Sequence, residues 1–369
     1  MRLSSQRLLL AMAIGSCSLP GIVSAQRPTN PDNTGYGTTA GEFLLLGAGA
    51  RGTALGAPFT ALATDASALY YNPAGAALVT GPQAMIGTYS YVADTRYSWG
   101  GVVFPFGGGS RAIGIQLGTF GFKDQPVYTP ESPAGTGATY AVSETFAGLT
   151  LAENFSDRFS AGLTAKGVFD QLGSAQGTAY ALDFGTMFHA KLSGHPIKMG
   201  FTLTNLGTSL KYSGSDLSRD IPRDTTGGTE PIAGQVKTKG FNLPTNFQVA
   251  LAYEAFSFSG SQLTVAGAFN QPNNNKAGFG GAVEWTANKL GGSAFGASVR
   301  GSYNYAPANN VNLSNAIPTA LSDEENLQGI AVGGGLSYNT GGFLLGVDYA
   351  FKYMGVLGPT NFVSLTVGW

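Results

Sequence analysis

Three groups of residues in this chain have types and spacings that could support chemistry. Residues 47–52 (GAGARG) fit the pattern G-x-G-x-x-G, and Asp65 lies downstream of them. In dinucleotide-binding domains this motif joins a strand to a continuous helix, and its glycines let the backbone approach a pyrophosphate. Here Gly56 and Pro58 would interrupt such a helix. The pattern therefore predicts close-packing glycines, and we expect no cofactor.

The two histidines and an acidic run are the other candidates. His189 falls on the polar face of its segment together with Asp183, whereas His195 lies in an expected turn. No nucleophile motif such as G-x-S-x-G accompanies them, and two separated histidines are too few for a zinc site. The run at residues 323–325 (DEE) is typical of a solvated loop. We expect neither catalytic residues nor a metal.

Composition favours a β protein that avoids charge. Only 11% of the 369 residues are charged, against roughly a quarter in soluble domains. Glycine, with 55 residues, is about twice as frequent as usual. The balance of 20 basic and 21 acidic residues argues against a nucleic-acid partner, which needs clustered basic surface. The apolar content of 43% argues against disorder.

The N-terminus has the parts of an export signal. Two arginines precede an apolar stretch at residues 8–15, and residues 23–25 (VSA) form a small-residue cleavage site, so residues 1–25 are predicted to be a signal peptide. The residues before Cys17 also resemble a lipobox, which leaves its lipidation open. Cleavage after residue 25 would leave no cysteine for thiol catalysis or disulfides. Residues 26–40 are expected to be a flexible segment.

From residue 81 onward, apolar and polar residues alternate with a period of two. In residues 343–353 every odd-numbered residue is apolar, and the even-numbered ones include Gly346 and Asp348. Fourteen segments of this kind can be counted, each about ten residues long, which is the length that a tilted strand needs to cross a bilayer. They centre near Gly87, Gly101, Leu117, Leu149, Leu163, Phe184, Phe201, Leu251, Val265, Val283, Val299, Gly334, Val347 and Leu365.

The connections between these segments alternate in length. Short ones at 107–109 and 339–342 contrast with long polar ones at 123–138, 208–242 and 307–326. Short turns on one side and long loops on the other are typical of outer-membrane barrels. We therefore predict an all-β fold: a 14-stranded antiparallel barrel over residues 81–369 in the cell outer membrane, with membrane lipid and the barrel-insertion machinery as partners.

A membrane barrel turns its apolar face outward, so strand charges must face the lumen. The charged strand residues fall on the polar phase, where glycine and alanine also leave room for a plug. We expect eight polar side chains to face the lumen: Lys166, Asp183, His189, Glu254, Glu284, Arg300, Asp348 and Lys352.

Residues 41–80 are helix-friendly, rich in alanine, and broken by glycine and proline. Because side chains of the wall alone cannot fill a lumen of this width, we expect this segment to fold inside as a helical hatch. Asp65 should cap a helical stretch at 66–71, and Asn72 before Pro73 suits a tight turn. The apolar residues expected to be buried against the wall are Phe43, Leu44, Leu45, Phe59, Leu69, Tyr70 and Tyr71.

Three stretches of this hatch resemble the N-terminal signature of the PorV/PorQ family: 41–44 (GEFL), 49–51 (GAR) and 65–75 (DASALYYNPAG). The NPA element also resembles the hatch of the related FadL transporters, and residues 348–365 resemble the end of PorV/PorQ proteins. The resemblance implies structural or gating roles for Gly49, Arg51, Asp65, Asn72, Pro73 and Gly75. The final residue, Trp369, resembles the aromatic signal that the barrel-insertion machinery reads.

The resemblance implies two non-enzymatic functions. The favoured one is an accessory or shuttle of type nine protein secretion, with secreted cargo proteins docking on loops 208–242 and 307–326. The alternative is a FadL-like transporter, in which a hydrophobic ligand enters between the loops and leaves through the wall when the hatch shifts.

Overall fold

The computed structural model describes residues 37–221, 232–258, 260–306 and 329–369. The expectations for the signal peptide, Cys17, the acidic run at 323–325 and the loop at 307–326 fall outside these residues. In the described part of the chain, no helix has the length and apolar character needed to span a bilayer.

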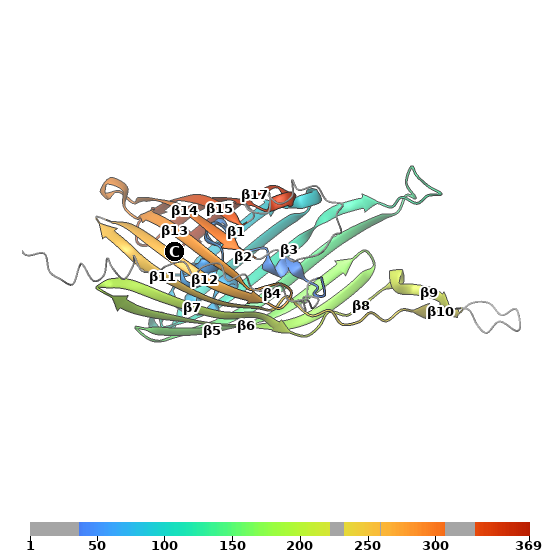
Figure 1. Cartoon of the computed structure of the whole chain (residues 1–369), viewed down its shortest axis with the longest axis horizontal. Coiled ribbons are helices and arrows are strands. Elements are labelled where there is room, and N and C mark those ends of the chain that lie inside the picture. Colours follow the sequence, from blue (N-terminus) through green and yellow to red (C-terminus); the bar gives the residue numbers. More distant parts are fainter. Residues whose placement is uncertain (1–36, 222–231, 259, 307–328) are drawn as a thin grey trace, which may run out of the picture. The chain divides into compact units, whose positions relative to one another are not determined.

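One closed antiparallel sheet forms the wall (Figure 1). It has fifteen strands, and because the two-residue β8 (Tyr212–Ser213) only extends the edge beside β6, fourteen make the barrel, which confirms the predicted fold. All fourteen predicted segment centres lie in these strands: β1 (Gln83–Ser90), β2 (Arg96–Phe106), β3 (Arg111–Pro126), β4 (Thr139–Ser156), β5 (Phe159–Leu172), β6 (Ala175–Leu192), β7 (His195–Gly207), β11 (Asn246–Phe258), β12 (Ser261–Pro272), β13 (Gly278–Ala287), β14 (Phe295–Tyr305), β15 (Ile330–Asn339), β16 (Leu344–Tyr353) and β17 (Pro359–Gly368).

The wall closes where its first and last strands meet. Gln83 of β1 faces Gly368 of β17, and the pairing continues to Thr88 and Val363. On the opposite side, β7 pairs with β11 across the longest connection, so every strand of the wall has two neighbours. A closed wall pairs its backbone groups strand to strand, as a hydrocarbon environment requires.

The two faces of the wall differ as the period-two pattern predicts. In β1, Ile86 is 62% exposed on the outside, whereas its neighbour Met85 is 3% exposed and points inward. Leu117, Val299 and Leu336 likewise expose half or more of their surface on the outer face. An outer belt of large apolar side chains fits contact with lipid.

The connections define two ends, which we call the short-turn end and the long-loop end. Short 3₁₀ turns join β2 to β3 and β13 to β14, whereas the β7–β11 connection contains its own two-stranded hairpin. Figure 1 shows this hairpin, β9 and β10, beyond the wall at the long-loop end. The elements of the connections are η4 (Val92–Asp94), η5 (Gly107–Gly109), η6 (Ser215–Leu217), β9 (Ser218–Ile221), β10 (Ile232–Gln235), η7 (Leu290–Gly292) and η8 (Gly355–Leu357).

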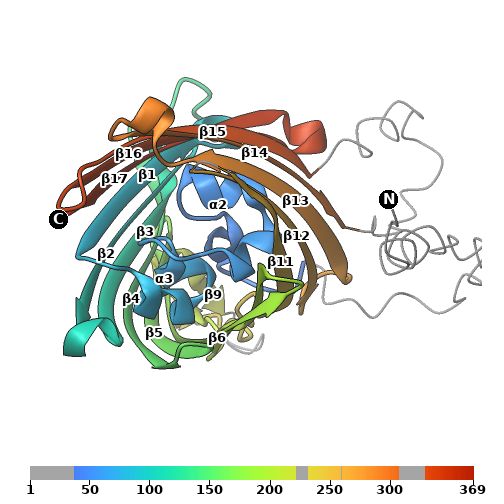
Figure 2. The ribbon, with the colours of Figure 1, turned by 90° about the vertical axis from the view of Figure 1, so that its left-hand side faces the viewer.

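The segment before β1 folds as short helices inside the ring of strands (Figure 2). Gly56 has φ +62° and ends α2, and a Cβ there would also overlap the side chain of Asn304. Pro58 and Pro73 each lie in the first turn of a 3₁₀ helix, η2 and η3. Proline is tolerated there because the backbone N–H that it lacks would have no partner within the helix. The hatch elements are η1 (Glu42–Leu45), α2 (Ala50–Leu55), η2 (Ala57–Ala61), α3 (Ala68–Tyr71) and η3 (Pro73–Leu78).

Candidate functional site

The hatch touches the wall mainly at glycines. A Cβ at Gly280 of β13 would lie 2.8 Å from Pro58, and one at Gly333 of β15 would lie 2.8 Å from Ala54. Glycines in β3, β5, β6 and β7 approach the hatch so closely that a Cβ would overlap Leu69, Pro73, Asn72 or Thr60. We call these wall residues the glycine belt: Gly114, Gly162, Gly185, Gly200, Gly280 and Gly333. The belt lets the hatch pack directly against the backbone of the wall.

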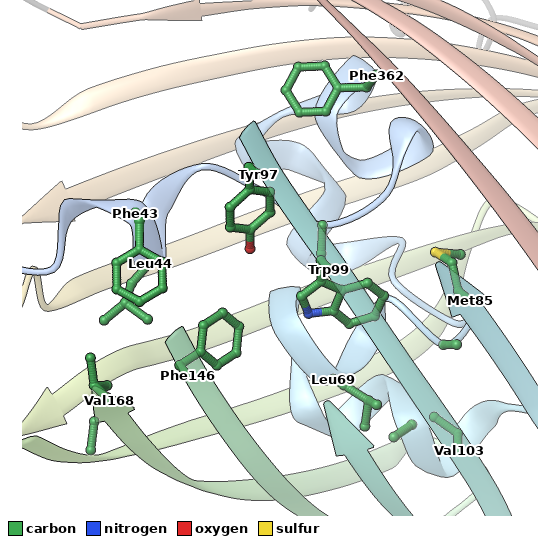
Figure 3. Close-up of a cluster of buried hydrophobic side chains, with 14 of the residues drawn as sticks. Phe43, Leu44, Leu69, Met85, Tyr97, Trp99, Val103, Phe146, Val168 and Phe362 are labelled. Carbon is green, nitrogen blue, oxygen red and sulfur yellow. The ribbon is translucent and has the colours of Figure 1, made fainter. Parts of the chain in front are cut away.

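Apolar side chains seal one side of the hatch against β2 to β5. Figure 3 shows Phe43 and Leu44 of the hatch beside Phe146 and Val168 of the wall, and the Phe43 and Phe146 rings have centroids 6.0 Å apart. The burial predicted for Leu45 is wrong, because the turn of η1 directs this residue toward the lumen cavity and leaves it 37% exposed.

Asn72 fastens the hatch to itself and to the wall. Its Oδ1 accepts a hydrogen bond from Ala74 N at 3.2 Å, which begins η3 at Pro73. Its Nδ2 donates to the carbonyl oxygens of Thr60 in the hatch (2.8 Å) and Thr186 in β6 (3.1 Å). The side chain is fully buried, so all three bonds form away from water, where losing one is costly.

The tight turn predicted after Asn72 requires Gly75. The η3 helix passes so close to the Ala63 carbonyl that a Cβ at Gly75 would overlap it. Asp65 differs slightly from its predicted cap, because its Oδ1 accepts from the backbone N–H of Ser67 at 3.0 Å, one residue before α3 begins at Ala68.

Five side chains form an ion-pair chain from the hatch across the lumen wall. Arg51 donates from Nη1 to Asp65 (3.0 Å) and from Nε and Nη2 to the two carboxylate oxygens of Glu284 in β13 (2.9 Å each). Glu284 pairs with Arg300 of β14 at 3.0 Å, and Arg300 with Asp348 of β16 at 2.6 Å. Charges alternate along the chain, so each carboxylate meets an arginine.

The environment of Arg51 keeps its charge. Burial disfavours the guanidinium, but the carboxylates of Glu284 and Asp65 outweigh that effect and hold the pKa of Arg51 above its ordinary value. The guanidinium carbon also lies 5.2 Å from the centre of the Phe59 ring, within the range of a cation–π contact.

Two hatch tyrosines contact the glycine-rich run at 47–52. Gly47 N donates to the hydroxyl of Tyr70 at 2.9 Å, and Ala48 N donates to that of Tyr71 at 3.1 Å. A Cβ at Gly52 would overlap the Tyr71 ring. These contacts agree with the close-packing interpretation of the motif.

The start of α2 lies at the seam of the barrel. Ala50 N donates to the hydroxyl of Ser364 in β17 at 3.0 Å. Gly49, with φ +69°, lies against Gly87 of β1, where an added Cβ would be 3.5 Å from the Gly49 Cα. The same few residues of the hatch therefore contact the first and the last strand.

The remaining predicted lumen residues lie outside this ion-pair chain. Lys166 binds Asp183 at 2.8 Å, and Asp183 also accepts from Asn205 N at 2.7 Å. His189 stands opposite Lys198 in the β6–β7 register and is not brought to Asp183. Glu254 accepts from Gln262 at 2.9 Å. Outside the lumen, Trp369 is 54% exposed and its ring contacts Phe104 edge-on at 6.3 Å.

A cavity of about 670 Å³ lies in the lumen between the hatch and the long-loop end. Leu44 to Gly47 and the two hatch tyrosines contribute its inner side. Its outer side comes from residues beside the long connections, such as Asn246 at the start of β11 and Tyr305 at the end of β14. This cavity was not predicted from the sequence, where its signal is the recurrence of asparagine at strand ends.

A second concavity, of about 770 Å³, lies along β1, β2, β3 and β17. It includes Gly100 and Gly101, consecutive residues on the outer and inner faces of β2, so the wall carries no side chain on either face there. Ile86, Ile115 and Val363 line it from neighbouring strands.

Comparison with known proteins relates the chain to outer-membrane channels by structure alone. No protein-family model and no curated protein sequence matches it. The toluene transporter TbuX of Ralstonia pickettii superposes with a TM-score of 0.52 and 13% identity over 88% of this chain and 98% of TbuX. The toluene transporter TodX of Pseudomonas putida superposes with a TM-score of 0.51 and 12% identity over 87% of this chain and 96% of TodX. This chain has their fold. The CymD monoaromatic hydrocarbon channel gives a TM-score of 0.50 and 13% identity over 88% and 97%.

Proposed function

We propose that the protein is a non-enzymatic outer-membrane channel for small molecules, in which the hatch closes the lumen. The fold shared with TodX, TbuX and CymD supports the transporter alternative more than the secretion reading. Outer-membrane barrels carry their long loops on the extracellular side, so the lumen cavity would face the outside of the cell. The lipid-facing belt would hold the barrel in the membrane.

The observation that carries the proposal is the way the hatch is held. The glycine belt and Asn72 make a tight seal, whereas the ion-pair chain joins hatch to wall through a single residue, Arg51. Opening of that ion pair would remove a charged bond between hatch and wall and leave the neutral ones of Asn72 and Ala50.

The test measures solute uptake by cells that lack their own outer-membrane channels for these solutes. Initial uptake of toluene, glucose and glucuronate is measured with the protein, with Arg51→Met, and with an empty vector. We expect at least one solute to enter faster with the protein than with the vector, and Arg51→Met to change that rate. If no solute of the panel enters faster than with the vector, the channel function is wrong.

A role as an accessory of type nine secretion is a second candidate. It is favoured by the PorV/PorQ-like residues at 41–44, 49–51 and 65–75, and by the β9–β10 hairpin that extends the loop predicted to dock cargo. Co-purification of exported proteins from native membranes, lost when residues 214–238 are replaced by a short linker, would support it. The same variant would leave solute uptake unchanged.

A further inference from the structure

The lumen cavity is lined by amide side chains from four strands. We call them the amide band: Asn205 of β7, Asn246 and Gln248 of β11, Asn270 of β12 and Asn304 of β14. Gln248 stands directly opposite Asn270 in the β11–β12 register, which places their Cβ atoms about 5 Å apart. Each amide offers both a donor and an acceptor. Asn205 uses both of them on Lys166 and the Pro244 carbonyl, and Asn304 uses both on Ala57 N and Ser302.

Part of this hydrogen-bonding capacity is unused. The Oδ1 of Asn246 is buried and has no partner among the described residues. Gln248 accepts from Thr60 at 2.8 Å, and no described residue accepts from its Nε2. An unpaired buried polar atom costs about 1–3 kcal/mol. A hydrocarbon in the cavity would leave these groups unpaired, whereas hydroxyl groups would satisfy donors and acceptors alike.

Lys352 supplies an uncompensated charge to the same cavity. It lies on the inner face of β16 next to the end of the strand, and no described residue accepts a hydrogen bond or forms an ion pair with its ammonium. Of the other charged residues of the lining, Lys166 pairs with Asp183 at 2.8 Å, and Glu42 accepts hydrogen bonds from Asn274 at 2.7 and 2.9 Å. A half-buried cation without a partner is stabilised by a bound anion.

We propose that this cavity binds a small hydroxylated carboxylate of the hexuronate type, with the carboxylate on Lys352 and the hydroxyls on the amide band. The inference rests on the proposed channel function and assigns its substrate class. The ammonium of Lys352, which has no ion-pair partner among the described residues, matches the single charge of a carboxylate better than that of a phosphate, which is about −1.5 to −2 at neutral pH. The cavity is within the range of about 300–1,000 Å³ of small-molecule sites.

Calorimetric titration of the purified full chain in detergent tests this assignment. We expect glucuronate to bind, glucose to bind more weakly, and toluene to release no heat. Lys352→Met should weaken glucuronate binding about tenfold or more, the cost of losing a hydrogen bond to a charged group, and leave glucose binding unchanged. Lys352→Arg should restore most of the affinity. Lys289→Met removes an exposed lysine of a short-turn-end connection and should change nothing.

Two further measurements distinguish a loss of folding from a loss of binding. A folded barrel is recognised by its altered mobility on unheated gels, which each variant must show, and Gln248→Leu gives an independent loss of affinity for both sugars. The assignment is wrong if glucuronate fails to bind, or if it binds equally well to Lys352→Met. If toluene uptake by cells persists in that case, the channel function stands and only the substrate class fails. If no solute is taken up, both fail.

Discussion

The guanidinium of Arg51 and the carboxylate of Glu284 meet in a bidentate pair, with both N–H···O distances at 2.9 Å. The two residues are 233 positions apart in the sequence and belong to the hatch and to the wall. Bidentate pairs fix orientation as well as distance. This pair therefore defines both where the hatch lies and how it is turned.

Removing the guanidinium should loosen the hatch. We expect Arg51→Met to destabilise the seated hatch by about 1.5–3 kcal/mol, because Asp65 loses its arginine and Glu284 keeps only Arg300, so hydrogen bonds to charged groups are lost. Hydrogen exchange of the α2 amides measures this opening. The matched control is Arg111→Met, whose pair with Glu153 is exposed at the barrel surface and is worth about 0–1 kcal/mol. Equal exchange in both variants would contradict the assigned role.

Filling one position of the glycine belt should push the hatch off the wall. A Cβ at Gly162 would overlap the backbone carbonyl carbon of Pro73, and overpacking of this kind costs about 1–3 kcal/mol. We expect Gly162→Ala to speed tryptic cleavage after Arg51. Gly281→Ala adds the same atom on the outer face of β13, where nothing lies within 4 Å, and should leave cleavage at the wild-type rate.

Truncating Asn72 should remove three buried hydrogen bonds. We expect Asn72→Ala to lower the stability of the hatch by about 1–3 kcal/mol for each group that water does not reach, measured as the thermal midpoint of the protein in detergent. Asn339→Ala removes an exposed asparagine that also accepts from a turn N–H, that of Gly341 at 2.8 Å. A larger effect of Asn339→Ala than of Asn72→Ala would refute the prediction.

Hatch stability should fall in strong alkali because of the tyrosines. Burial raises the pKa of Tyr71 from 10.0 to about 12 and the pKa of Tyr70 above its ordinary value. A raised folded-state pKa gives stability that is fully present below the unfolded pKa of 10.0 and is lost as the pH rises through about 12. The thermal midpoint of wild type should therefore fall relative to Tyr71→Phe between these pH values. A constant difference across that range would exclude the assignment.

The wall could be predicted from the sequence because its information is local. Alternation of neighbours, such as Met85 inside and Ile86 outside, is a property of a few residues. Tyr97 shows the limit of this alternation. The alternation predicts that its side chain points inward, but its hydroxyl is buried without a hydrogen-bond partner among the described residues because the hatch packs against it.

The contacts of the hatch could not be predicted, because they join distant positions. The alternation along β13 predicts that Glu284 faces the lumen, but its pairing with Arg51 depends on how the hatch is oriented within the barrel. Lys352 was placed in the lumen by the same rule, yet only the structure shows that no described residue pairs with it as Asp183 pairs with Lys166. The exposed position of Leu45 likewise follows from a single turn of η1.

The hydrogen bond from Ala50 to Ser364 has a consequence for how the protein is made. It joins α2, the first α-helix of the described chain, to β17, at the edge where β1 and β17 meet. A nascent barrel that still lacks β17 therefore has an open side and lacks this bond to α2, which is also held by the pair of Arg51 with Glu284. Closure of the barrel and formation of the bond between α2 and Ser364 therefore occur in one step, when β17 joins the wall.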